Sequence, residues 1–274
     1  MRRPFRLNNR IGTPDYCLGV PSYFWCLFYV SGGVYKREMS QKPASAPDEV
    51  PLLLSSFGRG LQTLLLAMIG GGIAVVFLMN WVNPTKTYYI WQEKQRLGNV
   101  EALWTPLDDI APVLARSVVA AEDANFCLHW GFDIAAIRTA LADGGRRGAS
   151  TLTQQTVKNV FLWPARSWLR KAFEAVLTPL VEVLWSKKRI LEVYLNVAEF
   201  GTGVFGVGAA SRHYFGVEPK NLTPVQAARL AAILPSPKMR SAAKPTSYVR
   251  ARAVAIADGA ATILKDQRSA CFED

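Results

Sequence analysis

A long run without charged residues, from position 60 to position 85, constrains this chain more than any other feature. Within it, residues 61–82 are largely apolar and could cross about 30 Å of hydrocarbon as a helix. The triplet Gly70-Gly71-Gly72 would weaken an isolated helix in water. Small residues are tolerated in lipid, however, because they let helices approach closely. The run therefore predicts one transmembrane helix over residues 61–82.

A cleaved secretory signal peptide is the alternative interpretation of this run. Signal peptides end in a cleavage site built from small residues. The run continues instead through Asn83, Pro84 and Thr85 into Lys86, and no such site follows it. A retained membrane anchor is the favoured interpretation.

Two segments precede the run. Residues 1–38 contain a second uncharged, aromatic-rich stretch that Pro21 interrupts, and they fit a protein with a single membrane span poorly. Residues 39–60 are predicted to be a flexible segment, and they begin with Met39. We hypothesise that translation begins at Met39 and that residues 1–38 belong to an over-extended reading frame.

The charge of the chain limits its partners. The formal net charge is +11, and residues 86–274 alone hold 24 Lys and Arg against 17 Asp and Glu. Such an excess suits anionic lipid headgroups, pyrophosphate or nucleic acid equally well. No nucleic-acid-binding motif accompanies it, and the predicted anchor favours the first two. Nucleic acid is therefore not expected as a partner.

The four cysteines, at positions 17, 26, 127 and 271, contain no CxxC pair. They are predicted to be free thiols. A bridge between Cys127 and Cys271 in an oxidising compartment is the alternative.

From Lys86 onward the sequence pattern is mainly helical. Apolar residues recur with the 3.6-residue period of a helix over residues 110–121. Thr223 followed by Pro224 is a strong helix start, with an N-cap and a proline in the first turn, and this helix is predicted to reach Ile233. Further helices are predicted over residues 151–162, 167–185 (with a bend at Pro179) and 187–200. The fold class is therefore mainly α.

The first group of chemically informative residues is the pair Glu122-Asp123, at the end of an apolar helix. Adjacent carboxylates raise each other's proton affinity when they are partly buried. A carboxylate with a raised pKa is a useful base near neutral pH. The alternative is that the pair only marks a solvated helix end, and this pair taken alone favours that alternative.

The second group lies where a basic loop enters a helix. Ser150, Gln154 and Lys158 recur every four residues and so share one helix face. The free N–H groups and the positive dipole end of such a helix can hold phosphate. A capped surface helix is the alternative explanation.

The third group contains Arg170 and Glu174, which are spaced to form an exposed ion pair on a helix. Such a pair contributes only about 0.3–0.5 kcal/mol. The rest of this helix is apolar, so Glu174 is expected at the edge of a core. In the helix that follows, Asn196 is expected to face inward and bond to backbone.

In their order and spacing, five motifs closely resemble those of the peptidoglycan glycosyltransferases, glycosyltransferase family 51. The resemblance covers about residues 86–245. The motifs are Glu-Asp-x-x-Phe-x-x-His-x-Gly from Glu122, Gly-x-Ser-Thr-x-Thr-Gln-Gln-x-x-Lys-Asn from Gly148, Arg-Lys-x-x-Glu from Arg170, Lys-x-x-Ile-Leu-Glu-x-Tyr-Leu-Asn from Lys187, and Leu-Pro-x-Pro from Leu234.

The resemblance implies a lysozyme-like, mainly α domain over residues 86–274, anchored by one N-terminal transmembrane helix, with residues 39–60 in the cytoplasm. It implies a single-pass protein of the bacterial inner membrane whose catalytic domain lies on the periplasmic face. The chain resembles the monofunctional biosynthetic type, without a transpeptidase domain. The implied partners are lipid II, the growing glycan strand, the membrane, and other cell-wall synthesis or division proteins.

The resemblance also implies residue roles. Glu122 matches the general base, which deprotonates the acceptor 4-hydroxyl so that it attacks the donor anomeric carbon with inversion and forms a β-1,4 link. Glu174 matches a second essential carboxylate, which orients cations or a divalent metal. The matching substrate-binding residues are Ser150, Thr151, Gln154, Gln155, Lys158, Asn159, Arg166 and Arg170. Of these, Lys158, Arg166 and Arg170 are the cations near the departing pyrophosphate. No residue is predicted as a metal ligand, although a Mg²⁺ or Mn²⁺ ion at the pyrophosphate remains open.

Two other functions compete with this one. A glycoside hydrolase on the same scaffold would also use two carboxylates, but hydrolysis of neutral glycan needs no cations such as Lys158, Arg166 and Arg170. A membrane-tethered scaffold with a dead site would not need to keep Glu122 and Glu174.

Overall fold

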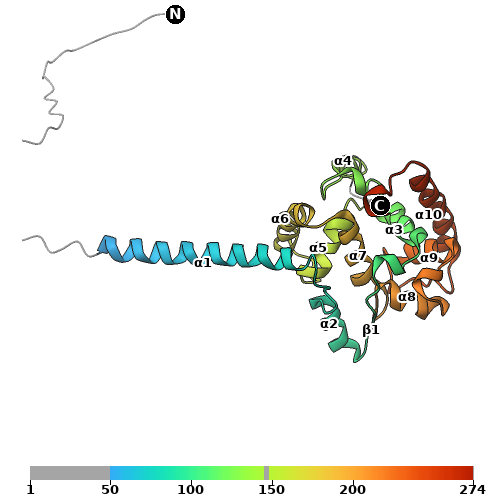
Figure 1. The fold of residues 1–274 in the computed structure, drawn as a ribbon, viewed down its shortest axis with the longest axis horizontal. Coiled ribbons are helices and arrows are strands. Elements are labelled where there is room, and N and C mark those ends of the chain that lie inside the picture. The colour runs from blue at the N-terminus through green and yellow to red at the C-terminus, as the bar shows by residue number, and fades with distance from the viewer. Residues whose placement is uncertain (1–49, 145–147, 274) are drawn as a thin grey trace, which may run out of the picture. The chain divides into compact units, whose positions relative to one another are not determined.

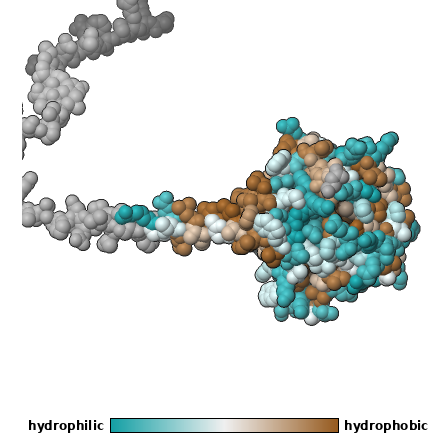
Figure 2. All heavy atoms as spheres, in the orientation of Figure 1, coloured by the Kyte–Doolittle hydropathy of each residue, from teal (hydrophilic) through white to brown (hydrophobic). Residues whose placement is uncertain are grey.

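The computed structural model describes residues 50–144 and 148–273, with side chains from Arg59 onward. The hypothesised extension at residues 1–38 and residues 39–49 of the predicted flexible segment lie outside the described residues. Residues 50–60 of that segment are helical, so the helix begins before the predicted start at residue 61. The first helix, α1 (Val50–Leu78), contains the stretch Arg59–Leu78, which is long and apolar enough to cross a membrane. Figure 2 shows that apolar residues gather along this helix.

The helix α1 ends at Leu78, before the predicted end at Val82. After Leu78 the backbone N–H groups of Asn80 and Trp81 bond to carbonyls three residues back, as in a tightening turn. The carbonyls of Met79 and Val82 accept hydrogen bonds from Arg189 Nη2 at 3.0 and 3.1 Å, and Trp185 Nε1 donates to Val76 O at 2.8 Å. Side chains from elsewhere in the domain therefore complete the end of α1.

The remaining chain is mainly helical, as predicted (Figure 1). Its α-helices are α2 (Tyr88–Leu97), α3 (Pro112–Glu122), α4 (Ile134–Ala142), α5 (Leu152–Phe161), α6 (Trp168–Leu184), α7 (Lys187–Val197), α8 (Gly206–Phe215), α9 (Pro224–Ile233), α10 (Ser247–Lys265) and α11 (Ala270–Glu273). Three 3₁₀ turns join them: η1 (Leu107–Asp109), η2 (Phe126–Leu128) and η3 (Pro219–Asn221).

A small sheet interrupts the helices. Its strands are β1 (Glu101–Ala102), β2 (Glu199–Gly201) and β3 (Val204–Phe205), in the order β1-β3-β2. The helix predicted over residues 187–200 is therefore too long at its C-terminal end. It ends at Val197, because Ala198 adopts an extended conformation and its carbonyl accepts the Gly206 N–H at 2.9 Å.

The core forms between α3, α9 and α10 on one side and between α5, α6 and α7 on the other. Leu114 and Val118 of α3, and Ile190 of α7, are completely buried. Asn196 faces inward, as expected: its Oδ1 accepts the Thr105 N–H at 2.7 Å and its Nδ2 donates to Thr105 O at 2.8 Å. These bonds fasten α7 to the segment that leads into α3.

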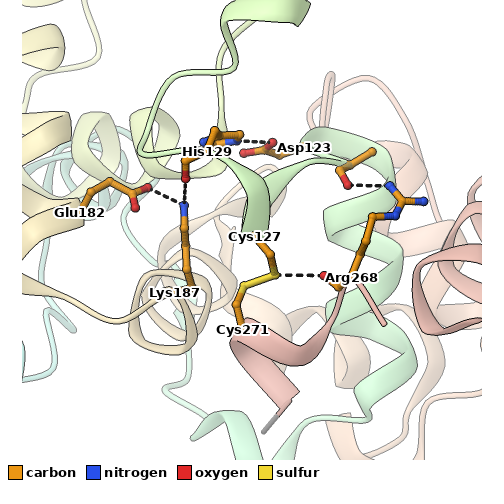
Figure 3. Close-up of a disulfide and its surroundings, with 8 residues drawn as sticks. Asp123, Cys127, His129, Glu182, Lys187, Arg268 and Cys271 are labelled. Carbon is orange, nitrogen blue, oxygen red and sulfur yellow. Dashed lines mark hydrogen bonds and ion pairs between the residues drawn. A yellow bond between two sulfur atoms is a disulfide. The ribbon is translucent and has the colours of Figure 1, made fainter. Parts of the chain in front are cut away.

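The prediction of free thiols is wrong for two of the four cysteines. Cys127 of η2 and Cys271 of α11 form a disulfide, with their Cα atoms 5.7 Å apart (Figure 3). The two cysteines are 144 positions apart in the chain, so no local pattern could reveal the pairing. Cys17 and Cys26 lie outside the described residues.

Candidate active site

Glu122 is the last residue of α3, and its two carboxylate oxygens have different surroundings. The Oε2 atom accepts a hydrogen bond of 2.9 Å from Gln155 Nε2 of α5. The Oε1 atom is buried and has no hydrogen-bond partner among the described residues. A buried oxygen without a partner is costly unless a ligand supplies a donor. Within the described part of the chain, one oxygen of Glu122 therefore lacks the hydrogen-bond donor that its burial calls for.

Burial is the main cause of a raised pKa for the Glu122 carboxyl. The hydrogen bond from Gln155 lowers this pKa, as do the charges of Arg252 and Lys158, while the charge of Asp123 raises it slightly. The sequence predicted a raised pKa from the adjacent carboxylates, but the neighbouring Asp123 is the smallest of these causes. The net effect is a carboxylate that is a stronger base than an exposed glutamate.

Asp123 has a structural role at the site. Its Oδ1 lies 2.8 Å from His129 Nε2, and its Oδ2 accepts the Leu152 N–H, at the first residue of α5, at 2.9 Å. Asp123 is 7% exposed, so the pair Glu122-Asp123 does not mark a solvated helix end. Asp123 joins the end of α3 to the start of α5.

Thr151 and Gln154 form a capping box at the start of α5. The Thr151 hydroxyl accepts the Gln154 N–H and donates to Gly131 O, while Gln154 Oε1 accepts the Thr151 N–H at 3.0 Å. Both side chains are buried, and their polar groups serve the helix start. The shared helix face of Ser150, Gln154 and Lys158 is thus interrupted at Gln154.

The two partners of the hydrogen bond between Glu122 and Gln155 line different cavities. The first cavity, of about 260 Å³, contains Glu122 and Ser150 in its wall, together with Asn125 and Asp133. The second cavity, of about 460 Å³, contains Gln155. Its other polar lining residues include Lys158, Asn159, Arg166, Tyr194, Glu199, Ser236 and Lys238.

Two cations of the second cavity are uncommitted. The side chains of Lys158 and Arg166 make no hydrogen bond or ion pair with any residue in the described part of the chain. Burial is the main cause of a lowered pKa for the Lys158 ammonium, against which the charges of Glu174 and Glu122 act. A partly desolvated cation without a counter-ion attracts an anionic ligand more strongly than a surface lysine does.

Arg170 and Glu174 line neither cavity and bind each other. Arg170 Nη1 lies 2.7 Å from Glu174 Oε2, and Lys171 also pairs with this carboxylate. The side chains of Arg170 and Glu174 are only 13% and 4% exposed, so the prediction of an exposed ion pair is wrong, whereas Glu174 at the edge of a core is confirmed. Arg170 Nε also donates to Ala165 O, next to Arg166.

Several residues of the site, among them Arg252, Tyr194 and Lys238, were not predicted as such. Arg252 of α10 lies near Glu122, with its Nη2 atom 3.5 Å from Ala121 O. Tyr194 of α7 donates a long hydrogen bond of 3.4 Å to Gln155 Oε1. Lys238 lines the second cavity and pairs with Glu199 at 3.5 Å. Local signals existed for Tyr194, which is the tyrosine of the motif that begins at Lys187, and for Lys238, which directly follows the Leu-Pro-x-Pro motif.

The residues present do not favour a protein-held divalent cation. Within residues 50–144 and 148–273, no three His, Cys, Asp or Glu side chains converge as metal ligands. Glu174, the carboxylate expected to orient a metal, has both oxygens engaged by Arg170 and Lys171. A divalent cation at this site remains an untested prediction, and no step of the chemistry is assigned to it.

Comparison with known proteins gives consistent results. Residues 92–261 match the family model described as Transglycosylase. A protein of Jannaschia sp. (strain CCS1) is 57% identical over 212 residues, which cover 76% of this chain and 89% of the relative. Proteins of Pseudomonas entomophila (strain L48) and Caulobacter vibrioides are 52% and 43% identical, covering 73% and 77% of this chain and 89% and 94% of the relatives. All three relatives are named biosynthetic peptidoglycan transglycosylase.

Proposed function

Because the chain belongs to the transglycosylase family, and is a peptidoglycan glycosyltransferase of mainly α, lysozyme-like fold, we propose that it polymerises lipid II into β-1,4-linked glycan. The reaction inverts the donor anomeric carbon and releases undecaprenyl pyrophosphate. The observation that carries this proposal is the hydrogen-bonded pair Glu122–Gln155, in which Glu122 lines one cavity and Gln155 lines a second cavity that also contains two uncommitted cations.

In the proposed reaction the acceptor sugar lies in the first cavity. Its 4-hydroxyl donates to Glu122 Oε1, the oxygen that lacks a partner among the described residues. The raised pKa makes this carboxylate a better proton acceptor near neutral pH. As the hydroxyl oxygen bonds to the donor anomeric carbon, its proton passes to Glu122. The bond from that carbon to the phosphate oxygen breaks, and its electron pair leaves with the pyrophosphate.

The donor pyrophosphate lies in the second cavity. Lys158 and Arg166 stabilise the negative charge that develops on the leaving oxygen. Asn159 lines the same cavity and contacts the donor. Arg170 and Glu174 act through Arg166, because Arg170 holds the Ala165 carbonyl and is itself oriented by Glu174.

The membrane part of the proposal assigns one span to the bacterial inner membrane, with the catalytic domain on the periplasmic face. The apolar stretch Arg59–Leu78 supports the span. A lipid-linked substrate supports the location, because its sugar must reach a site that is tethered to the same membrane. Association with other cell-wall synthesis or division proteins stays a prediction.

A lytic hydrolase is the competing function, and one incubation separates the two. Detergent-solubilised protein is given labelled lipid II, or preformed glycan, and the products are separated on a gel. The proposal predicts a ladder of polymer from lipid II. Release of muropeptides from preformed glycan, without polymer from lipid II, would establish hydrolysis instead.

A further inference from the structure

The loop of residues 123–129, directly after the proposed base, is held by a segment that is distant in the sequence. Figure 3 shows Arg268 and Cys271, from the segment of residues 266–273, beside Cys127 of this loop. Arg268 Nη1 donates to Ala124 O at 3.0 Å, and Cys271 is bonded to Cys127. We call residues 266–273 the brace. The brace therefore has a polar and a covalent attachment to the loop.

Two further contacts extend from the same segment. The ring of Phe272 packs against that of Phe126, with centroids 6.4 Å apart, and both side chains are buried. Glu273 pairs with Arg116 of α3 at 2.7 Å, and both of these side chains are largely buried. The brace thus touches the loop and the helix that carries Glu122.

The loop is hydrogen-bonded at both ends to helices near the site. Asp123 holds the first N–H of α5, the helix of Gln155 and Lys158. At the other end of the loop, Lys187 Nζ donates to His129 O at 2.7 Å. A displacement of the loop would therefore move the base and its hydrogen-bond partner relative to each other.

Two side chains of the loop, Asp123 and Phe126, are buried, and the ring of Phe126 contacts Phe272 of the brace. The rest of the loop has little burial of its own: its regular structure is one 3₁₀ turn, Ala124 and Asn125 are exposed, and Leu128 is 68% exposed. Exposed segments of this kind open at low free-energy cost unless other elements hold them. Residues 266–273 also follow the span 92–261 that matches the family model, so the brace lies outside that matched span.

We propose that Cys127, Cys271 and Arg268 are positioning residues for glycosyl transfer, which keep the loop closed so that Glu122 stays buried against Gln155. This inference rests on the proposed function, in which Glu122 is the base. The disulfide holds the closed loop covalently, and the arginine holds it by a hydrogen bond. Neither cysteine reacts during the transfer.

The test compares oxidised and reduced full-length enzyme in a background with Cys17→Ser and Cys26→Ser, so that one disulfide alone responds. Dithiothreitol supplies two electrons and two protons, giving two thiols on the enzyme and a cyclic disulfide on the reagent. The initial rate of lipid II polymerisation is measured across pH, together with Tm. All assays run well below the lower Tm.

Reduction should lower kcat by at least about tenfold, because small displacements of catalytic groups are costly, while KM changes by less than about twofold. The acid limb of the pH profile of kcat/KM should move to lower pH. Loosening the loop lets water reach Glu122, which lowers its pKa because burial is the main cause of the raised value. Weakening of the hydrogen bond from Gln155 acts in the opposite direction, but it is the smaller of the two effects. Asp123, within the loop, also faces Glu122 and has the smallest of the charge effects on it, while Lys158, Arg252 and the Tyr194 hydroxyl face it from helices that stay in place.

Variants provide a second, independent measurement. Cys127→Ser with Cys271→Ser should reproduce the reduced enzyme and no longer respond to dithiothreitol. Arg268→Ala should lower kcat in the same direction, and Arg268→Lys should recover part of the loss. Arg212→Ala is the matched control, because it removes an exposed arginine that pairs only with Glu218 among the described residues. It should leave kcat and the pH profile unchanged.

The outcomes are distinct. Polymerisation that is equal in the oxidised and reduced enzymes, with an unmoved acid limb, would overturn the inference while leaving the proposed function intact, even if Tm falls. Free thiols at Cys127 and Cys271 in the air-oxidised protein would also overturn it. Failure of the oxidised enzyme to polymerise lipid II at all would overturn the proposed function, and the inference with it.

Discussion

Gln155 donates a hydrogen bond of 2.9 Å to Glu122, and this bond connects helices that begin far apart in the sequence. It occupies one oxygen of the carboxylate and leaves the other, which is buried, without a partner among the residues described. Gln155 also accepts from Tyr194, so its amide orientation is fixed. The base is therefore oriented by a neutral chain of hydrogen bonds, which does not neutralise it.

Gln155→Ala should lower kcat/KM by about ten- to a hundredfold, the size of one hydrogen bond to a charged group. The hydrogen bond lowers the pKa of Glu122, so its loss raises that pKa. The acid limb of the pH profile should then move to higher pH, opposite to the effect of reducing the disulfide. Gln226→Ala, which removes the capping glutamine of α9 away from both cavities, serves as the control. An acid limb unchanged in Gln155→Ala would contradict the orienting role.

Lys158→Ala should lower kcat by about a hundred- to a thousandfold, because its charge is most valuable as the pyrophosphate leaves. Steady-state rates with labelled lipid II give kcat and KM separately. Lys265→Ala, at an exposed position of α10, is the matched control and should behave as wild type. A turnover rate unchanged in Lys158→Ala would show that this lysine takes no part in the reaction.

Thr151→Ala should affect stability more than substrate affinity. The hydroxyl caps α5 and donates to Gly131 O, and loss of such a cap costs about 0.5–2 kcal/mol. Urea unfolding of the variant gives this free energy, while KM for lipid II should stay within about twofold. A large rise in KM at unchanged stability would instead support direct contact between Thr151 and the substrate.

Glu122→Gln should raise the Tm at neutral pH. Burial makes the pKa of Glu122 higher in the folded state than its unfolded value of about 4.3. The folded state therefore binds the proton more tightly, and folding stability falls as pH rises from about 4.3 through the raised pKa. The neutral variant avoids this loss of folding stability. Each kcal/mol that it retains raises the Tm by about 2–4 °C. Calorimetry between pH 4 and 7.5 should show a difference that grows with pH; a constant difference would contradict the burial argument.

The parts of the fold that were predicted correctly have local causes. The helix α9 begins as predicted because Thr223 caps it and Pro224 suits its first turn. The helix α3 was predicted correctly from the 3.6-residue period of its apolar residues. The end of α7 at Val197 was missed, since it depends on pairing between β2 and β3, which are joined by a tight turn in which Gly203 has a φ of +74°.

The site was predictable in its residue types and only partly in its geometry. The sequence identified Glu122, Gln155 and Lys158 from their motifs, and the structure brings them together. It gave no signal for Arg252, which reaches Glu122 only because α10 packs against α3. The capping box of Thr151 and Gln154 was visible as Thr-x-x-Gln, but the phosphate-binding interpretation of the same residues obscured it.

The most direct test of the central claim, that Glu122 is the base, is the initial rate of polymerisation of labelled lipid II by the wild-type enzyme and by Glu122→Gln. Tm and lipid II binding are measured on the same preparations. The account predicts that the ladder of polymer disappears in the variant, with lipid II still bound and Tm not reduced. A ladder formed at a near-normal rate by folded Glu122→Gln would contradict it and require another proton acceptor.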